Sequence, residues 1–130
     1  MKLGRALPFA ILIAVSACSV TPDPQKIGPY PDDYRAIIKA HIHKTYFDPY
    51  SIRDASVSDP QQGYIYFQQG WIVCVQDNAK NRLGGYVGLT TTAYLINHGE
   101  IVDSQDGVGA AMCKNVTMIP WPELEGGGDK

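Results

Sequence analysis

The sequence lacks most of the residue patterns that bring catalytic or metal-binding groups together. Its three histidines include no His-x-x-x-His pair, and its three cysteines include no Cys-x-x-Cys pair. No serine lies in a Gly-x-Ser-x-Gly segment, and no glycine-rich phosphate loop precedes a predicted helix. Metal hydrolases, dithiol oxidoreductases, serine hydrolases and nucleotide-binding enzymes depend on such patterns. We therefore expect no catalytic site, no metal site and no cofactor.

Positive charge is also scarce. The formal net charge is −2, and without Lys2 and Arg5 nine basic side chains face thirteen acidic ones, a balance of −4. Nucleic-acid binding requires a basic surface, so we expect no nucleic-acid partner. The length of 130 residues corresponds to one domain.

No apolar run in the sequence is long enough for a membrane-spanning helix. The longest candidate, residues 7–15, is short and contains Pro8, and it follows the cations Lys2 and Arg5. This arrangement is typical of a signal peptide. The run ends in Val15-Ser16-Ala17-Cys18, which resembles the lipobox of bacterial lipoproteins. The resemblance predicts a signal peptide over residues 1–17 and lipidation of Cys18; the alternative is an ordinary signal peptide cut near Ala17, with Cys18 a plain thiol.

Lipidation at Cys18 would attach the protein to a membrane, since several acyl chains together form a stable anchor. Ser19 follows the cysteine, whereas lipoproteins retained in the inner membrane usually carry aspartate there. The resemblance therefore implies the outer membrane, with the domain facing the periplasm. Residues 18–29 contain three prolines and a glycine, which predicts a flexible tether between the lipid and the folded domain.

The folded domain is predicted to span residues 30–122. Pro31, Asp32 and Asp33 are typical of a helix start, and apolar residues at helical spacing follow as far as Asp48-Pro49. His41 and His43 lie in this helix about 200° apart, so they are not expected to share a metal ion. Alternating segments then predict strands near residues 51–58, 64–68, 71–77, 86–97 and 101–103. The expected fold is α+β, one N-terminal helix packed on an antiparallel sheet of four to five strands, with a disordered tail over residues 123–130.

Two cysteines remain once Cys18 is assigned to lipid. Cys74 and Cys113 form an even pair, and the periplasm is an oxidising compartment. We expect a disulfide between them; the alternative is two separate free thiols.

Residues 78–86 form the segment with the most polar chemistry. Lys80, Asn81, Arg82 and Tyr86 combine two cations, an amide and an aromatic ring near paired glycines. One interpretation is a recognition loop for an acidic or glycan-bearing partner, with these four residues in contact with it. The other is a long hairpin turn, closed by asparagine side chains and by glycines at positive φ.

Two segments together resemble a family of small bacterial outer-membrane lipoproteins. One is Asp48-Pro49-Tyr50-Ser51, and the other runs Cys74-x3-Asn78-Ala79-Lys80-Asn81-x2-Gly84-Gly85-Tyr86-x-Gly88. The similarity covers about residues 32–103 and implies no catalytic residues. We therefore expect a membrane-anchored lipoprotein with a non-enzymatic binding or structural domain, whose partners are envelope proteins or peptidoglycan. The alternative is a periplasmic inhibitor of a cell-wall hydrolase of the lysozyme type, which would insert the same loop into an active site.

Overall fold

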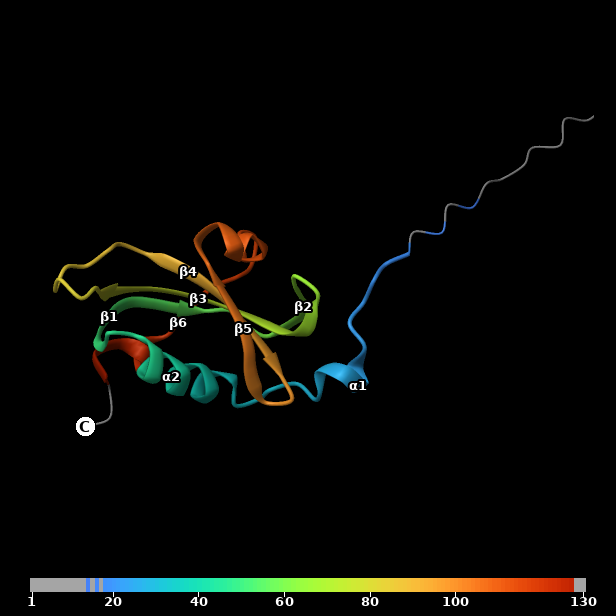
Figure 1. Ribbon diagram of the computed structural model, residues 1–130, viewed down its shortest axis with the longest axis horizontal. Helices are drawn as coiled ribbons and strands as arrows, with labels where there is room; N and C mark the ends of the chain where they lie inside the picture. Colours follow the sequence, from blue (N-terminus) through green and yellow to red (C-terminus); the bar gives the residue numbers. More distant parts are fainter. Residues whose placement is uncertain (1–13, 15, 17, 128–130) are drawn as a thin grey trace, which may run out of the picture.

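The protein folds around one antiparallel sheet of six strands (Figure 1). The computed structural model describes residues 14, 16 and 18–127. The strand order is β5-β4-β3-β1-β6, and β2 pairs with β3 outside this path. The strands are β1 (Asp48–Val57), β2 (Gln61–Ile65), β3 (Gln68–Lys80), β4 (Thr90–Asn97), β5 (Glu100–Asp106) and β6 (Ile119–Pro120). The helical elements are α1 (Pro24–Ile27), α2 (Tyr34–Thr45) and the 3-10 helices η1 (Gly107–Cys113) and η2 (Pro122–Gly127).

The predicted α+β class and antiparallel sheet are confirmed, but the element count differs. There are six strands rather than four to five, and α1 and the two 3-10 helices were not expected. The helix predicted after Pro31 corresponds to α2. The predicted signal peptide, residues 1–17, lies outside the described residues apart from Ala14 and Ser16. In the part of the chain that the structure describes, no helix is long and apolar enough to cross a membrane.

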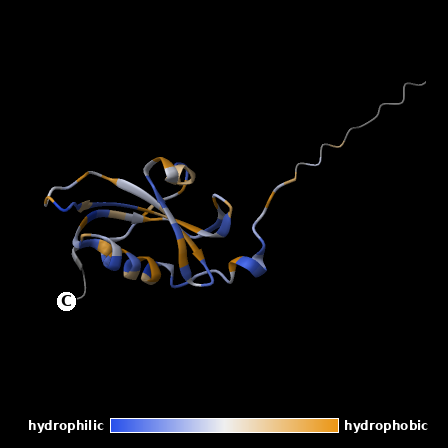
Figure 2. Cartoon of the chain, in the orientation of Figure 1, coloured by the Kyte–Doolittle hydropathy of each residue, from blue (hydrophilic) through white to orange (hydrophobic). Residues whose placement is uncertain are grey.

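Both faces of the central strands are buried, because different elements cover each face. On one face α2 and η2 pack on a core that includes Val73, Val75, Tyr94 and Ile96. On the other face η1 covers a smaller core; its buried members are Ile65, Cys74, Ala93, Leu95, Ala110 and Cys113. Figure 2 shows hydrophobic stretches along the central strands and an alternating pattern on α2. Successive residues of a strand point to opposite faces, so the middle of β3 and of β4 carries an unbroken apolar run.

β4 begins four residues later than the strand predicted over residues 86–97. The alternation from Tyr86 predicted that Val87 and Leu89 face the core, but β4 begins at Thr90, and these two side chains are 62% and 59% exposed. Tyr86 makes only an isolated bridge with Lys80. Alternation alone does not require pairing, and here the chain leaves the sheet before these residues reach the core.

The tether is predicted over residues 18–29, and in the structure its second half packs against the sheet. Asp23 caps α1 through a hydrogen bond from the Gln25 N–H, and Ile27 is fully buried. The Asp23 N–H donates to Gln69 Oε1 at 2.9 Å, and the Trp71 indole donates to the Gly28 carbonyl at 3.2 Å. One buried isoleucine and these hydrogen bonds hold a segment whose proline content predicted flexibility.

The disordered tail is predicted over residues 123–130; in the structure residues 123–127 belong to η2, and residues 128–130 lie outside the described residues. Leu124 of η2 is fully buried in the core beside α2. β1 is irregular near Asp54, which takes a positive φ of 55°, and the Ala55 N–H donates to the Glu125 carboxylate at 2.8 Å. The Ala55 carbonyl accepts from the Trp121 N–H at 2.8 Å. The C-terminal segment therefore satisfies the backbone groups of Ala55, next to the irregular part of β1.

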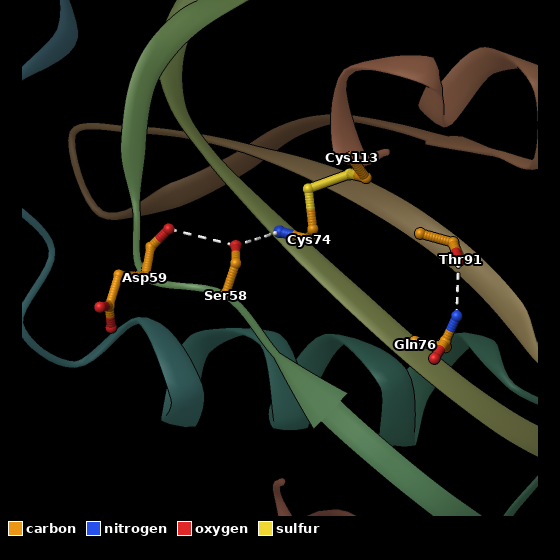
Figure 3. The surroundings of a disulfide bond; sticks show 6 residues. All are labelled: Ser58, Asp59, Cys74, Gln76, Thr91 and Cys113. Atoms are coloured by element: carbon orange, nitrogen blue, oxygen red, sulfur yellow. Dashed lines mark hydrogen bonds between the residues drawn. A yellow bond between two sulfur atoms is a disulfide. The ribbon is translucent and has the colours of Figure 1, made fainter. Parts of the chain in front are cut away.

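The predicted disulfide between Cys74 and Cys113 is confirmed (Figure 3). It joins the middle of β3 to the end of η1, with 5.7 Å between the two Cα atoms. Ser58, the residue after β1, supports the cysteine, since its Oγ accepts a hydrogen bond from the Cys74 N–H at 2.9 Å. The disulfide therefore fastens η1 over the second face of the sheet, where the hydrophobic cluster is small.

Candidate functional site

A cleft of about 520 Å³ opens between the C-terminal end of α2 and the adjoining ends of β3 and β4. The β3–β4 loop, residues 81–89, borders it, and every residue of this loop is exposed. The floor is formed by Tyr46, Asp77 and Tyr94, and Phe47, Arg82 and Val87 also line the cleft. We call this feature the cleft below.

The floor of the cleft contains a buried carboxylate. Asp77 is only 2% exposed, and its Oδ2 accepts a hydrogen bond from the Tyr46 hydroxyl at 2.9 Å. Burial raises the pKa of the Asp77 carboxyl, because the charged form loses solvation, and the Tyr46 hydrogen bond opposes that rise. A buried, hydrogen-bonded carboxyl group therefore lies at the floor of the cleft.

The two tyrosines of the floor remain protonated at physiological pH. Burial raises the pKa of Tyr46 well above its usual value of 10.0, and the nearby Tyr94 and Asp77 add to this rise. Burial also raises the pKa of Tyr94 to about 12, although a hydrogen bond with Tyr46 works in the opposite direction. The floor thus presents a carboxyl group and neutral hydroxyls that can hydrogen-bond a ligand, and neither tyrosine is poised as a nucleophile or general base.

The rim of the cleft combines a cation with an aromatic ring. The Arg82 guanidinium lies over the Phe47 ring, 5.2 Å from its centroid, and both residues are exposed. Lys80 and Asn81 also line the cleft. An arginine held on an aromatic face keeps its hydrogen-bond donors available for a carboxylate or another planar acceptor.

The structure separates the four residues predicted to bind a partner. Lys80, Asn81 and Arg82 line the cleft, whereas Tyr86 is not among its lining residues. The Tyr86 ring lies under the Arg53 guanidinium at 3.6 Å, and its hydroxyl donates to the Ser51 carbonyl at 2.9 Å. Tyr86 therefore holds the loop against β1.

Asn81 shapes the loop. Its Oδ1 accepts hydrogen bonds from the N–H groups of Leu83 and Gly85, at 2.9 and 3.2 Å. Its backbone N–H donates to the Gly85 carbonyl, and Gly84 takes a positive φ of 78°. These bonds match the hairpin-turn interpretation. Asn81 and Tyr86 both make contacts within the protein, so among the four residues predicted to bind a partner the cations Lys80 and Arg82 are the ones placed to contact it.

The two segments that carry the family resemblance meet in space. The Ser51 hydroxyl donates to the Asp48 carbonyl at 2.7 Å and accepts from the Lys80 N–H at 2.8 Å. Asn78 is buried, and its Oδ1 accepts from the N–H of Gly88, whose φ is 94°. The motif residues therefore set the shape of the β3–β4 loop.

Sequence reasoning missed the floor of the cleft. The sequence pattern places Asp77 at the end of the predicted strand 71–77. Nothing in the pattern brings Tyr46, Phe47 and Tyr94 to the same site. One signal was available: a carboxyl group that follows an apolar strand run costs free energy when buried unless it is hydrogen-bonded. The hydrogen-bond partner of Asp77 is Tyr46, which directly follows α2, and only the fold brings it to β3.

The fold and the cleft define a disulfide-linked α+β domain with a lateral cleft. No protein-family model matches the chain, and comparisons with curated proteins and with solved structures found no match.

Replacing Asp77 by asparagine is expected to flatten the pH dependence of stability. In the native state the pKa of Asp77 is raised above 3.8, so the folded protein holds this proton more tightly than the unfolded chain does. The unfolding free energy therefore falls as the pH rises from the unfolded pKa through the folded one, and is constant above it. Asparagine does not titrate, yet it can still accept the Tyr46 hydrogen bond.

The measurement is urea unfolding of wild type and Asp77→Asn across about pH 3 to 7. The exposed Asp32→Asn serves as the control and should leave the wild-type profile in place. Parallel profiles for wild type and Asp77→Asn would show that burial does not perturb this carboxyl.

Proposed function

We propose that this chain is a lipid-anchored protein of the bacterial envelope, whose folded domain is a non-enzymatic binding module. Cys18 is an exposed free cysteine. The segment that precedes α1 extends away from the body (Figure 1). This position leaves it accessible for acylation, and the lipobox-like residues before it support the same assignment. The partner is peptidoglycan or an envelope protein, and the outer membrane facing the periplasm is the proposed location.

The cleft is the proposed binding site. Its rim presents Arg82 stacked on Phe47, and its floor presents Asp77 with two protonated tyrosines. A ligand with a carboxylate for the cations and with hydroxyl or amide groups for the floor would match both parts. Acidic peptide chains and the glycan and stem peptides of peptidoglycan have this chemistry.

Binding should weaken strongly when both cations are removed. Lys80→Ala/Arg82→Ala is expected to reduce affinity for the partner about tenfold or more, because one hydrogen bond to a charged group contributes about 1.5 kcal/mol or more. The melting temperature should change little, since an exposed cation–π pair such as Arg82 on Phe47 contributes only about 0.5–1 kcal/mol.

The test is co-sedimentation with purified peptidoglycan, run beside capture from solubilised envelopes. The control variant Lys26→Ala/Lys114→Ala removes the same charge at two exposed lysines outside the cleft. Equal binding by the wild type and both variants would refute a role for the cleft cations.

A second candidate, inhibition of a lysozyme-type hydrolase, is favoured by the exposure of the β3–β4 loop. Leu83 near its tip is 93% exposed, and Arg82 lies beside it. Glycosidase active sites contain paired carboxylates, which an inserted cation would neutralise. Inhibition of lysozyme by the purified domain, lost in Arg82→Ala, would support this candidate; full lysozyme activity in its presence would exclude it.

A further inference from the structure

The β2–β3 hairpin ends in two exposed aromatic residues. Tyr66 and Phe67 form its turn, and their side chains are 73% and 99% exposed. Tyr66 takes a positive φ of 52°, a conformation that is rare for a bulky side chain. Two-residue hairpin turns with positive φ usually contain glycine or asparagine. Strained backbone of this kind tends to persist at functional sites, so the aromatic turn calls for a functional explanation.

The hairpin is uncharged where β2 pairs with β3. Residues 60–76 contain no aspartate, glutamate, lysine, arginine or histidine, and the polar residues near the turn are mainly glutamines. The Tyr66 hydroxyl donates to Gln105 Oε1 at 3.4 Å, which steadies one side of the turn and leaves Phe67 at its tip. An uncharged hairpin with an aromatic tip suits the membrane interface, where aromatic rings are enriched and charged groups are costly to bury.

The N-terminal segment runs beside this hairpin. The Tyr64 hydroxyl donates to the Thr21 carbonyl at 3.4 Å, and the Asp23 N–H donates to Gln69 Oε1 at 2.9 Å. Cys18 precedes Thr21 by three residues, so an extended chain keeps it within about 11 Å of Thr21. A lipid on Cys18 would therefore enter the membrane close to the hairpin.

The opposite end of β3 carries the cleft. β3 has thirteen residues, which corresponds to about 40 Å between its ends at roughly 3.3 Å per residue. In Figure 1, β2 and the N-terminal segment lie at one end of the sheet, and the β3–β4 loop lies at the other. A domain standing on the hairpin would point the cleft away from the membrane.

We propose that the Tyr66–Phe67 turn inserts into the bilayer that holds the lipid on Cys18, and so orients the cleft away from that membrane. This inference rests on the proposed lipid anchor. It assigns the hairpin a second membrane contact, which would convert a flexible attachment into an oriented one. Two membrane contacts on one rigid body bind more persistently than one, because the second contact is intramolecular.

The test places a tryptophan at the tip. The mature chain from residue 18 is coupled through the Cys18 thiol to maleimide lipid in phosphatidylethanolamine/phosphatidylglycerol vesicles, with or without brominated acyl chains. Cys18 suits this coupling because Cys74 and Cys113 form the disulfide. Phe67→Trp is compared with Leu83→Trp at the far end of β3, and the emission of Trp71 and Trp121 in the wild type is subtracted.

We expect brominated lipid to reduce the added emission of Phe67→Trp by about half or more, and to leave that of Leu83→Trp unchanged. Both positions are more than nine-tenths exposed, so neither variant should alter the melting temperature. Equal emission of Phe67→Trp in both kinds of vesicle would overturn the inference. If the emission is unquenched and Phe67→Ser also loses a captured envelope protein, the hairpin contacts that protein and not the bilayer.

Mass spectrometry of the Cys18 peptide from bacterial membranes tests the anchor separately. An acylated Cys18 with no quenching at position 67 would leave the proposed function intact and overturn only the membrane contact of the hairpin. An unmodified Cys18 would overturn both the anchor and the oriented attachment.

Discussion

Replacing Leu124 by alanine is expected to lower the unfolding free energy by about 2–5 kcal/mol, as large-to-small substitutions in cores generally do. Leu124 is fully buried and belongs to the same core cluster as Trp121, Ile52 and Ile38. Truncation would leave a cavity between η2, β1 and α2, in a region where the Glu125 carboxylate also satisfies the Ala55 N–H. Urea unfolding followed by circular dichroism measures the change.

The control for this prediction is Glu123→Ala in the same short helix. Glu123 is exposed, so its removal should change stability by less than about 0.5 kcal/mol. If Leu124→Ala behaves like Glu123→Ala, the C-terminal segment does not pack on the core in solution. The same measurement on a chain ending at Pro122 should show a loss at least as large, because that chain also lacks the Glu125 carboxylate that accepts from the Ala55 N–H.

Removing the disulfide is expected to have an effect of similar size. For the 39-residue separation between Cys74 and Cys113, the chain-entropy model gives a loss of about 4 kcal/mol in Cys74→Ala/Cys113→Ala. The loss should be large because the second core is small and η1 depends on the crosslink to stay on the sheet. Urea unfolding without reductant compares the variant with wild type.

Two further observations make this prediction specific. Cys18→Ala removes the exposed free thiol and should leave the unfolding curve unchanged. Adding reductant should shift the wild-type curve toward that of the double variant and should not affect the double variant itself. A double variant as stable as wild type would show that η1 is held by packing alone.

Local sequence patterns determined the elements whose signals are short-range. The spacing of Tyr34, Ile38 and Ile42 predicted one buried helix face, and Asp48-Pro49 predicted where the helix ends; both are properties of neighbouring residues. The pairing of Cys74 with Cys113 followed from counting, because only two cysteines remained once Cys18 was assigned to lipid.

Only the tertiary structure decided what depends on contacts between distant residues. Val87 and Leu89 alternate like core residues but are exposed, and Leu124 lies in a glycine-rich tail but is buried, because burial depends on which element reaches the residue. The cleft arises in the same way: Asp77 on β3 meets Tyr46 beside α2 and Tyr94 on β4 only when these elements pack. Periodicity records which side of an element is apolar, whereas packing determines what covers that side and which polar groups meet there.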